Sequence, residues 1–160
     1  MYLVNLSTKN KDMKRQYLED VLTLLKDNVK ELRWIDADEG QLDFYDERPP
    51  VAFPCCLVDV SMPQCEMKSI TMPVMQKCLL RVTLTVAFDD CASLNCRTPQ
   101  TVREVAYRRL DLLQHIHQAL QGRWQDKFLQ CYSRRSCTPR RRQDGLKTYE
   151  VVYDALVIEG

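Results

Sequence analysis

The run from Cys78 to Phe88 constrains the fold of this chain more than any other stretch, because apolar residues occupy every second position along it. This two-residue period is typical of a β-strand with one face on a core. We therefore expect a strand here. The residues predicted to face the core are Cys78, Leu80, Val82, Leu84, Val86 and Phe88, and those on the other face are Leu79, Arg81, Thr83, Thr85 and Ala87.

Two stretches have the three-to-four spacing of apolar residues that marks an amphipathic helix. The first runs from Asp12 to about Leu32, and the second carries its apolar stripe from Val102 to Leu120. Thr101 and Glu104 have the spacing of a capping box at the start of the second helix. Gly122 suits the left-handed residue that ends it.

Three further strands are predicted from β-favouring composition. They run from Val51 to Met62, from Phe128 to Ser133 and from Leu146 to Ile158. Asp144-Gly145 favours a turn just before the last of them. The stretch from Pro63 to Gln76 is either a long hairpin connection or an irregular extension of the strands.

The resulting order is helix, strand, strand, helix, strand, strand. Two hairpins that each follow a helix predict an α+β fold, with a mostly antiparallel sheet and two main helices packed on one face. A chain of 160 residues has the length of one compact domain, and no repeat or linker divides residues 1–160.

Charge and glycine content exclude several function classes. The 23 basic and 22 acidic residues leave a net charge of +1, which supplies no global field to attract nucleic acid or anionic lipid. The four glycines lie too far apart to form a phosphate-binding loop. His115 and His117, two positions apart on a predicted helix, face different ways and cannot share a metal. We expect no enzyme activity and no cofactor.

The eight cysteines are predicted to be reduced and free of metal. The start of the chain has neither the basic leader nor the apolar stretch of an export signal, so we expect the protein to stay in the cytoplasm. Cys91 with Cys96, and Cys131 with Cys137, could offer four thiolates to zinc. Four and five intervening residues are, however, looser than the usual spacing of structural zinc sites. The thiols expected to pack as small hydrophobes inside strands are Cys55, Cys56 and Cys78.

Residues 36–50, the acidic loop, carry most of their charge as carboxylates and contain the breakers Gly40 and Pro49-Pro50. Clustered carboxylates could hold a divalent ion, as in nucleases. A solvated surface loop is the favoured interpretation, because no regular spacing supports an ion site. The acidic residues are Asp36, Asp38, Glu39, Asp43, Asp46 and Glu47.

Residues 134–142, the arginine segment, lie in a stretch from Lys127 to Lys147 whose only acid is Asp144. Guanidinium groups at this density repel one another, so an anionic partner is expected. A hairpin tip that orders against a protein, a nucleic-acid contact and a solvated tip all remain open. We expect this turn to be poorly ordered in an isolated subunit. Its arginines are Arg134, Arg135, Arg140, Arg141 and Arg142.

Together these elements resemble the tail terminator, or tail completion, proteins of long-tailed bacteriophages. The first helix and the acidic loop lead into the segment Arg48–Pro54, RPPVAFP, and its strand. The alternating strand Leu80–Val86 and the helix Val102–Leu120 follow. Tyr132-Ser133-Arg134-Arg135 then leads through Asp144-Gly145 into a Tyr-Glu-Val-Val-Tyr strand. The resemblance covers most of the chain and rests on the order of its elements.

The resemblance implies a non-enzymatic structural protein of a phage or prophage that caps the tail tube, ends tail polymerisation and joins tail to head. Its implied partners are further copies of itself in a hexameric ring, the tail tube protein and a neck or head-completion protein. DNA would be only passing cargo, with no membrane involved. The protein would be assembled in the host bacterial cytoplasm and would end in the virion tail.

Two alternatives remain. A head-tail connector or minor tail protein of related fold would share the same elements. A small nucleic-acid-binding or metal-dependent nuclease-like domain is the alternative of another class.

A closed ring needs two different patches on each subunit that meet at every junction. We therefore expect the six acidic residues of the acidic loop and the five arginines of the arginine segment to form an assembly surface that pairs between subunits. Pairing within one subunit is the alternative.

Overall fold

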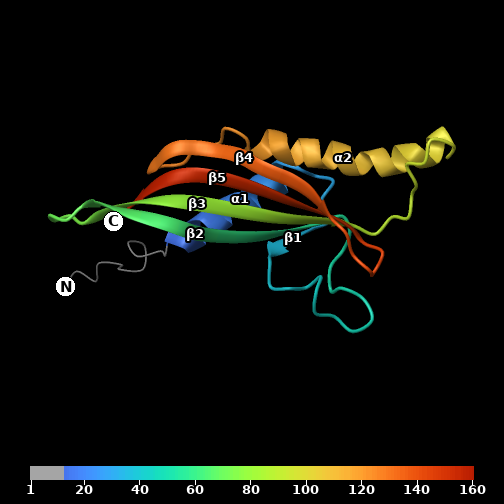
Figure 1. Ribbon diagram of the computed structural model, residues 1–160, viewed down its shortest axis with the longest axis horizontal. Coiled ribbons are helices and arrows are strands. Elements are labelled where there is room, and N and C mark those ends of the chain that lie inside the picture. Colours follow the sequence, from blue (N-terminus) through green and yellow to red (C-terminus); the bar gives the residue numbers. More distant parts are fainter. Residues whose placement is uncertain (1–12) are drawn as a thin grey trace, which may run out of the picture.

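The computed structural model describes residues 13–160, which form two helices and five strands (Figure 1). The helices are α1, Met13–Asn28, and α2, Gln100–Leu120. The strands are β1, Trp34–Ala37; β2, Cys55–Ser69; β3, Met75–Phe88; β4, Phe128–Arg140; and β5, Lys147–Glu159.

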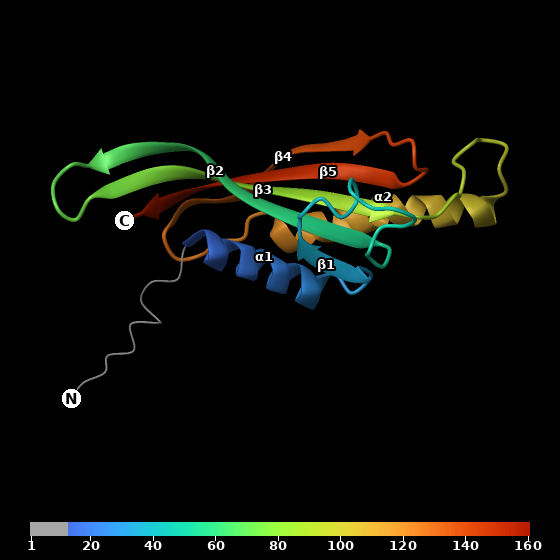
Figure 2. The ribbon, with the colours of Figure 1, turned by 90° about the horizontal axis from the view of Figure 1, so that it is seen from below.

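The strands form one mixed sheet in the order β1-β2-β3-β5-β4. β1 runs parallel to β2, and the other neighbouring pairs are antiparallel. Both helices lie on the same face of the sheet (Figure 2). The α+β fold with a mostly antiparallel sheet is therefore confirmed, with β1 as an addition to the predicted order.

The main core lies between the helices and this face of the sheet. The residues of β3 that were predicted to face the core are all buried, and Leu84 lies opposite Val58 of β2 and Val151 of β5. Burial of these apolar side chains away from water stabilises the packing of the helices on the sheet. The buried residues that the helices contribute are Tyr17, Val21 and Leu25 from α1, and Leu112, Leu113, Ile116, Ala119 and Leu120 from α2.

The other face of the sheet has a second, smaller core at one end. Residues 38–54 cross this end, and Leu42 and Val51 pack there against Leu57 and Ala87. The rest of this face lacks such a cover among the described residues. Its half-exposed side chains include Leu79, Arg81, Thr83, Val152 and Leu156.

The boundaries of the N-terminal elements differ from the predicted ones. α1 ends at Asn28, although Val29 and Leu32 beyond it are still buried, and Asp12 lies outside the described residues. β1 was not predicted, and it takes Asp36 out of the acidic loop and into the sheet. A strand this short carries too little alternation to be recognised by its own pattern.

The two strands of the β2–β3 hairpin extend almost to its tip. Both strands continue through most of the region from Pro63 to Gln76, so the strand extension is confirmed. The pairing register shifts between Ser61 and Gln64, which accommodates Pro63 because proline cannot donate a ladder hydrogen bond. β2 begins at Cys55 rather than at the predicted Val51.

The predicted capping box at the start of α2 is wrong. Pro99 occupies the N-cap position without a side-chain cap, and the carboxylate of Glu104 accepts instead from Nε2 of Gln100 at 2.6 Å. The predicted end of the helix holds, because Gly122 has a φ of +76°.

β4 extends to Arg140, beyond its predicted end at Ser133. Arg134 lies opposite Tyr153, and Arg140 lies opposite Thr148, whose hydroxyl donates to the Arg140 carbonyl at 2.7 Å. The expectation of a poorly ordered turn from Arg134 to Arg142 is therefore wrong for its strand residues, because their backbone pairs with β5.

Candidate assembly surface

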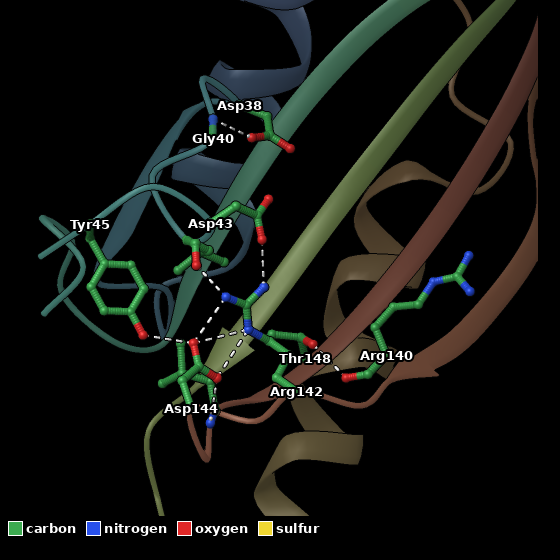
Figure 3. Close-up of polar contacts among 10 residues, drawn as sticks. Asp38, Gly40, Asp43, Tyr45, Arg140, Arg142, Asp144 and Thr148 are labelled. Atoms are coloured by element: carbon green, nitrogen blue, oxygen red, sulfur yellow. Dashed lines mark hydrogen bonds and ion pairs between the residues drawn. The ribbon is translucent and has the colours of Figure 1, made fainter.

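Arg142 is the centre of the contact between the acidic loop and the β4–β5 turn (Figure 3). Its guanidinium lies 2.8 Å from Asp43 and 2.9 Å from Asp144, and it also donates to the Leu42 carbonyl. The side chain is only 20% exposed, so these charge-assisted bonds are partly shielded from water. Arg142 therefore anchors the acidic loop within a single chain.

The charge network shifts the pKa values of the groups around Arg142. The hydrogen bonds from this guanidinium hold the pKa of Asp144 near 2, below the usual aspartate range. The same carboxylate raises the pKa of Arg142 and, through a 2.7 Å bond from the phenol, that of Tyr45. All three groups thus keep their ordinary charge states at neutral pH.

The remaining carboxylates of the acidic loop make local contacts or face solvent. Asp36 accepts from the side chain of Gln41, and Asp38 accepts from the amide of Gly40 at 3.0 Å (Figure 3). Gly40 has a φ of +82°, which favours glycine at this turn. The acidic side chains that are exposed include Glu39, Asp46 and Glu47.

The arginine segment divides between the two faces of the sheet and the turn. Arg135 lies 3.5 Å from Asp154, and Arg140 lies 2.8 Å from Glu150. Arg134 pairs opposite the core residue Tyr153, on the helix side of β4. Arg141 is exposed at the turn. The structure therefore does not gather the five arginines into one patch.

Only part of the predicted charge pairing is tested by these contacts. Asp43 and Arg142 pair inside one subunit, which is the arrangement that the alternative of internal pairing describes. The proposal of pairing between subunits remains for the exposed members. Those are Asp38, Glu39, Asp46, Glu47, Arg134, Arg135, Arg140 and Arg141.

A charged row across β3, β5 and β4 was not predicted from the sequence. The carboxylate of Asp154, which is 5% exposed, accepts from Nε and Nη2 of Arg81 at 3.0 and 3.1 Å. Arg135 approaches it from the other side. The signal was present as Arg81 within the alternating strand, but the pairing depends on strand register. This row places charged side chains, held in position by ion pairs, on the sheet face that the helices do not cover.

A second ion pair, between a buried arginine and a partly buried aspartate, joins α2 to the segment after β3. Nη2 of Arg109 lies 2.6 Å from Asp90 and 2.7 Å from the Ala92 carbonyl, and Arg109 is only 6% exposed. The hydrogen bonds from Arg109 lower the pKa of Asp90. This pair borders a mostly apolar pocket of about 380 Å³ between α2 and the end of β3.

The histidines face different ways, as predicted. His115 is exposed and contacts Glu31, whereas Nδ1 of the half-buried His117 lies 3.1 Å from the Tyr153 hydroxyl. Burial lowers the pKa of His117, with a further contribution from Arg134. They form no common site.

Three cysteines lie buried inside strands, as predicted: Cys55, Cys56 and Cys78. Burial raises the pKa of Cys55 to about 11 and that of Cys78 to about 12, so both are protonated at neutral pH. Across residues 13–160, no group of three or more histidine, cysteine or acidic residues is arranged to hold a metal ion.

The comparisons with known proteins add little to this geometry. No protein family model and no curated protein matches the chain. Among solved structures, a chain of the "Virion of native gene transfer agent (GTA) particle" matches with a TM-score of 0.47 and 12% identity, over 89% of this chain and 92% of that chain.

Neither α1 nor α2 has the length and apolar character that a membrane-crossing helix requires.

Proposed function

We propose that this chain is a non-enzymatic structural subunit of a phage or prophage tail, which closes a ring at the end of the tail tube. In this role it ends tail polymerisation and joins the tail to the head. The proposed partners are further copies of itself in a six-membered ring, the tail tube protein and a neck protein. The proposal starts from the resemblance of its elements, in their order, to those of tail terminator proteins.

The observation that supports it most is the sheet face that residues 38–54 cover at only one end. A ring subunit needs two different surfaces that meet across each junction. The open face offers one of them, with the fixed row Arg81, Asp154 and Arg135 among half-exposed side chains such as Thr83 and Val152. Ion pairs held in place before association favour register and specificity at an interface more than they favour affinity.

The nuclease-like alternative loses support from the contacts that the carboxylates of the acidic loop make. Asp43, one of the carboxylates that would bind the metal, is already paired with Arg142. Asp38 accepts from the loop backbone at Gly40. A divalent ion in the acidic loop would have to displace both contacts.

Electron micrographs of the purified full-length chain test the proposal. We expect closed rings with six-fold symmetry at low ionic strength and high protein concentration. Open filaments or isolated particles of single-chain size under the same conditions would contradict it.

A further inference from the structure

The tip of the β2–β3 hairpin exposes apolar side chains to solvent. Ile70 is 86% exposed and Met72 is 88% exposed, with Met67 and Val74 beside them. We call these four residues the hairpin tip. Figure 1 shows the hairpin projecting beyond both helices at one end of the long axis. A cluster of exposed large apolar residues on a projecting arm is typical of an interaction site.

The apolar pocket described above lies at the other end of the molecule. It opens between α2 and the end of β3, and Pro54, Phe88, Val105 and Leu112 supply its apolar walls. We call it the α2 pocket. The ion pair of Arg109 and Asp90 holds its border in place. A pocket of about 380 Å³ is large enough to receive apolar side chains.

Charges around the hairpin tip and the α2 pocket are complementary. The lining of the α2 pocket carries four carboxylates and the two guanidinium groups of Arg108 and Arg109, so it is acidic on balance. Its carboxylates include Asp89 and Asp111, and Lys68 lies next to the hairpin tip in the sequence. Within residues 13–160, none of these three side chains takes part in an ion pair. A basic residue beside an apolar tip therefore matches acidic residues beside an apolar pocket.

The hairpin tip cannot reach the α2 pocket of its own chain. β3 begins at Met75 beside the tip and ends at Phe88 in the pocket wall, and its 14 residues span on the order of 45 Å. A hairpin tip that occupies this pocket must therefore come from a second molecule. A tip and a pocket at opposite ends of one subunit form a head-to-tail contact, which closes into a ring when the rotation between neighbours allows it.

We infer that the hairpin tip of one copy inserts into the α2 pocket of the next copy. This inference rests on the proposed ring function and names a contact between neighbouring subunits in addition to the open sheet face. Ile70 and Met72 supply the inserted apolar groups, and Val105 lies in the wall that receives them. Lys68 approaches Asp89 and Asp111 at the rim.

The test uses two variants that each lose one half of the contact. The tip variant combines Ile70→Ser with Met72→Ser, and the pocket variant is Val105→Glu. Trp124→Ser is the matched control, because Trp124 is 60% exposed and lies outside both sites. Melting temperatures within a few degrees of wild type establish that each variant is folded.

Mass measurements on the separate and mixed variants give the decisive result. Each variant alone should remain a single chain under conditions in which wild type and Trp124→Ser assemble. Their mixture should give a species of two chains and nothing larger, because only one intact tip and one intact pocket can meet. A mixture that stays at single chains, or a tip or pocket variant that assembles like wild type, overturns the inference.

A charge exchange keeps the inference testable if Val105→Glu unfolds the chain. Asp111→Lys then serves as the pocket variant, and Lys68→Asp in a second copy should restore association. Rings formed by the tip variant would contradict this contact while leaving the proposed function intact. A wild-type chain that never associates would contradict both.

Discussion

Nη1 of Arg142 lies 2.8 Å from Oδ1 of Asp43, although the two residues are 99 positions apart in the chain. This contact joins the acidic loop to the β4–β5 turn within one subunit. It also separates the charges of the predicted assembly surface into two groups. Some hold the fold together, and others, such as Asp46, Glu47 and Arg141, are exposed to solvent.

Arg142→Ala should lower the free energy of unfolding by about 1 to 2 kcal/mol, because it leaves the carboxylates of Asp43 and Asp144 without their shared donor. Chemical denaturation measures the change. Arg141→Ala is the matched control, since Arg141 is exposed, and it should change stability by less than about 0.5 kcal/mol. Equal effects of the two substitutions would contradict the anchoring role of Arg142.

The stability that Arg142 provides should depend on pH. The folded pKa of Asp144 is held near 2, below the usual value of about 3.9 for an aspartate in an unfolded chain. Its contribution is therefore complete above about pH 4 and is lost as the pH falls toward 2. Unfolding free energies of wild type and Arg142→Ala should converge over this range. If the difference in unfolding free energy between wild type and Arg142→Ala stays constant down to pH 2, the Asp144 carboxylate does not contribute to it.

Arg81 and Asp154 should be coupled energetically. A double-mutant cycle with Arg81→Ala and Asp154→Ala should give an interaction of about 1 to 3 kcal/mol, because the carboxylate is buried and held by two hydrogen bonds. The exposed pair Lys77 and Glu66, 3.8 Å apart, is the control and should give less than about 0.5 kcal/mol. A coupling no larger than that of the control would contradict a fixed charge row.

Charge reversal of the exposed arginines should impair assembly without unfolding the subunit. Reversing Arg140 and Arg141 to Glu together is expected to weaken association at low salt, and added salt should weaken it in wild type. The melting temperature should change little, because the Arg140–Glu150 pair is exposed. Arg142 is left intact because its reversal would also break the internal anchor. Normal assembly of the double reversal would contradict a role for these residues between subunits.

The protein should not cleave DNA with magnesium or manganese present. Gel assays on linear duplex test this expectation, and cleavage abolished by Asp43→Ala or Asp46→Ala would support the nuclease-like alternative instead. Binding to duplex DNA across a salt series is the companion measurement. A steep fall of the logarithm of affinity with the logarithm of salt concentration would indicate phosphate contacts by the exposed arginines.

The long elements could be predicted because their patterns are repeated many times. The alternation from Cys78 to Phe88 and the stripe from Val102 to Leu120 each recur over several periods, and both correspond to observed elements. β1 and the second half of β4 were missed because they are edge strands with polar or short sequences. Their conformation is fixed by the neighbouring strands β2 and β5 rather than by their own composition.

The candidate site could be predicted only as a set of charges. The sequence identifies the acidic loop and the arginine segment, but not which members meet. Arg142 reaches Asp43 because of the way residues 38–54 fold back across the sheet, and Arg81 meets Asp154 because of the β3–β5 register. Neither relationship is encoded in local spacing. Long-range contacts of this kind require the three-dimensional fold.

The mass of the assembled full-length chain tests the central claim, that this protein is a ring-forming structural subunit. Native mass spectrometry at low ionic strength, over rising protein concentration, separates the possible states. The account predicts a closed species six times the 18.8 kDa of one chain, with no further growth as concentration increases. A single chain at every concentration, or a series of species that grows without limit, would contradict it.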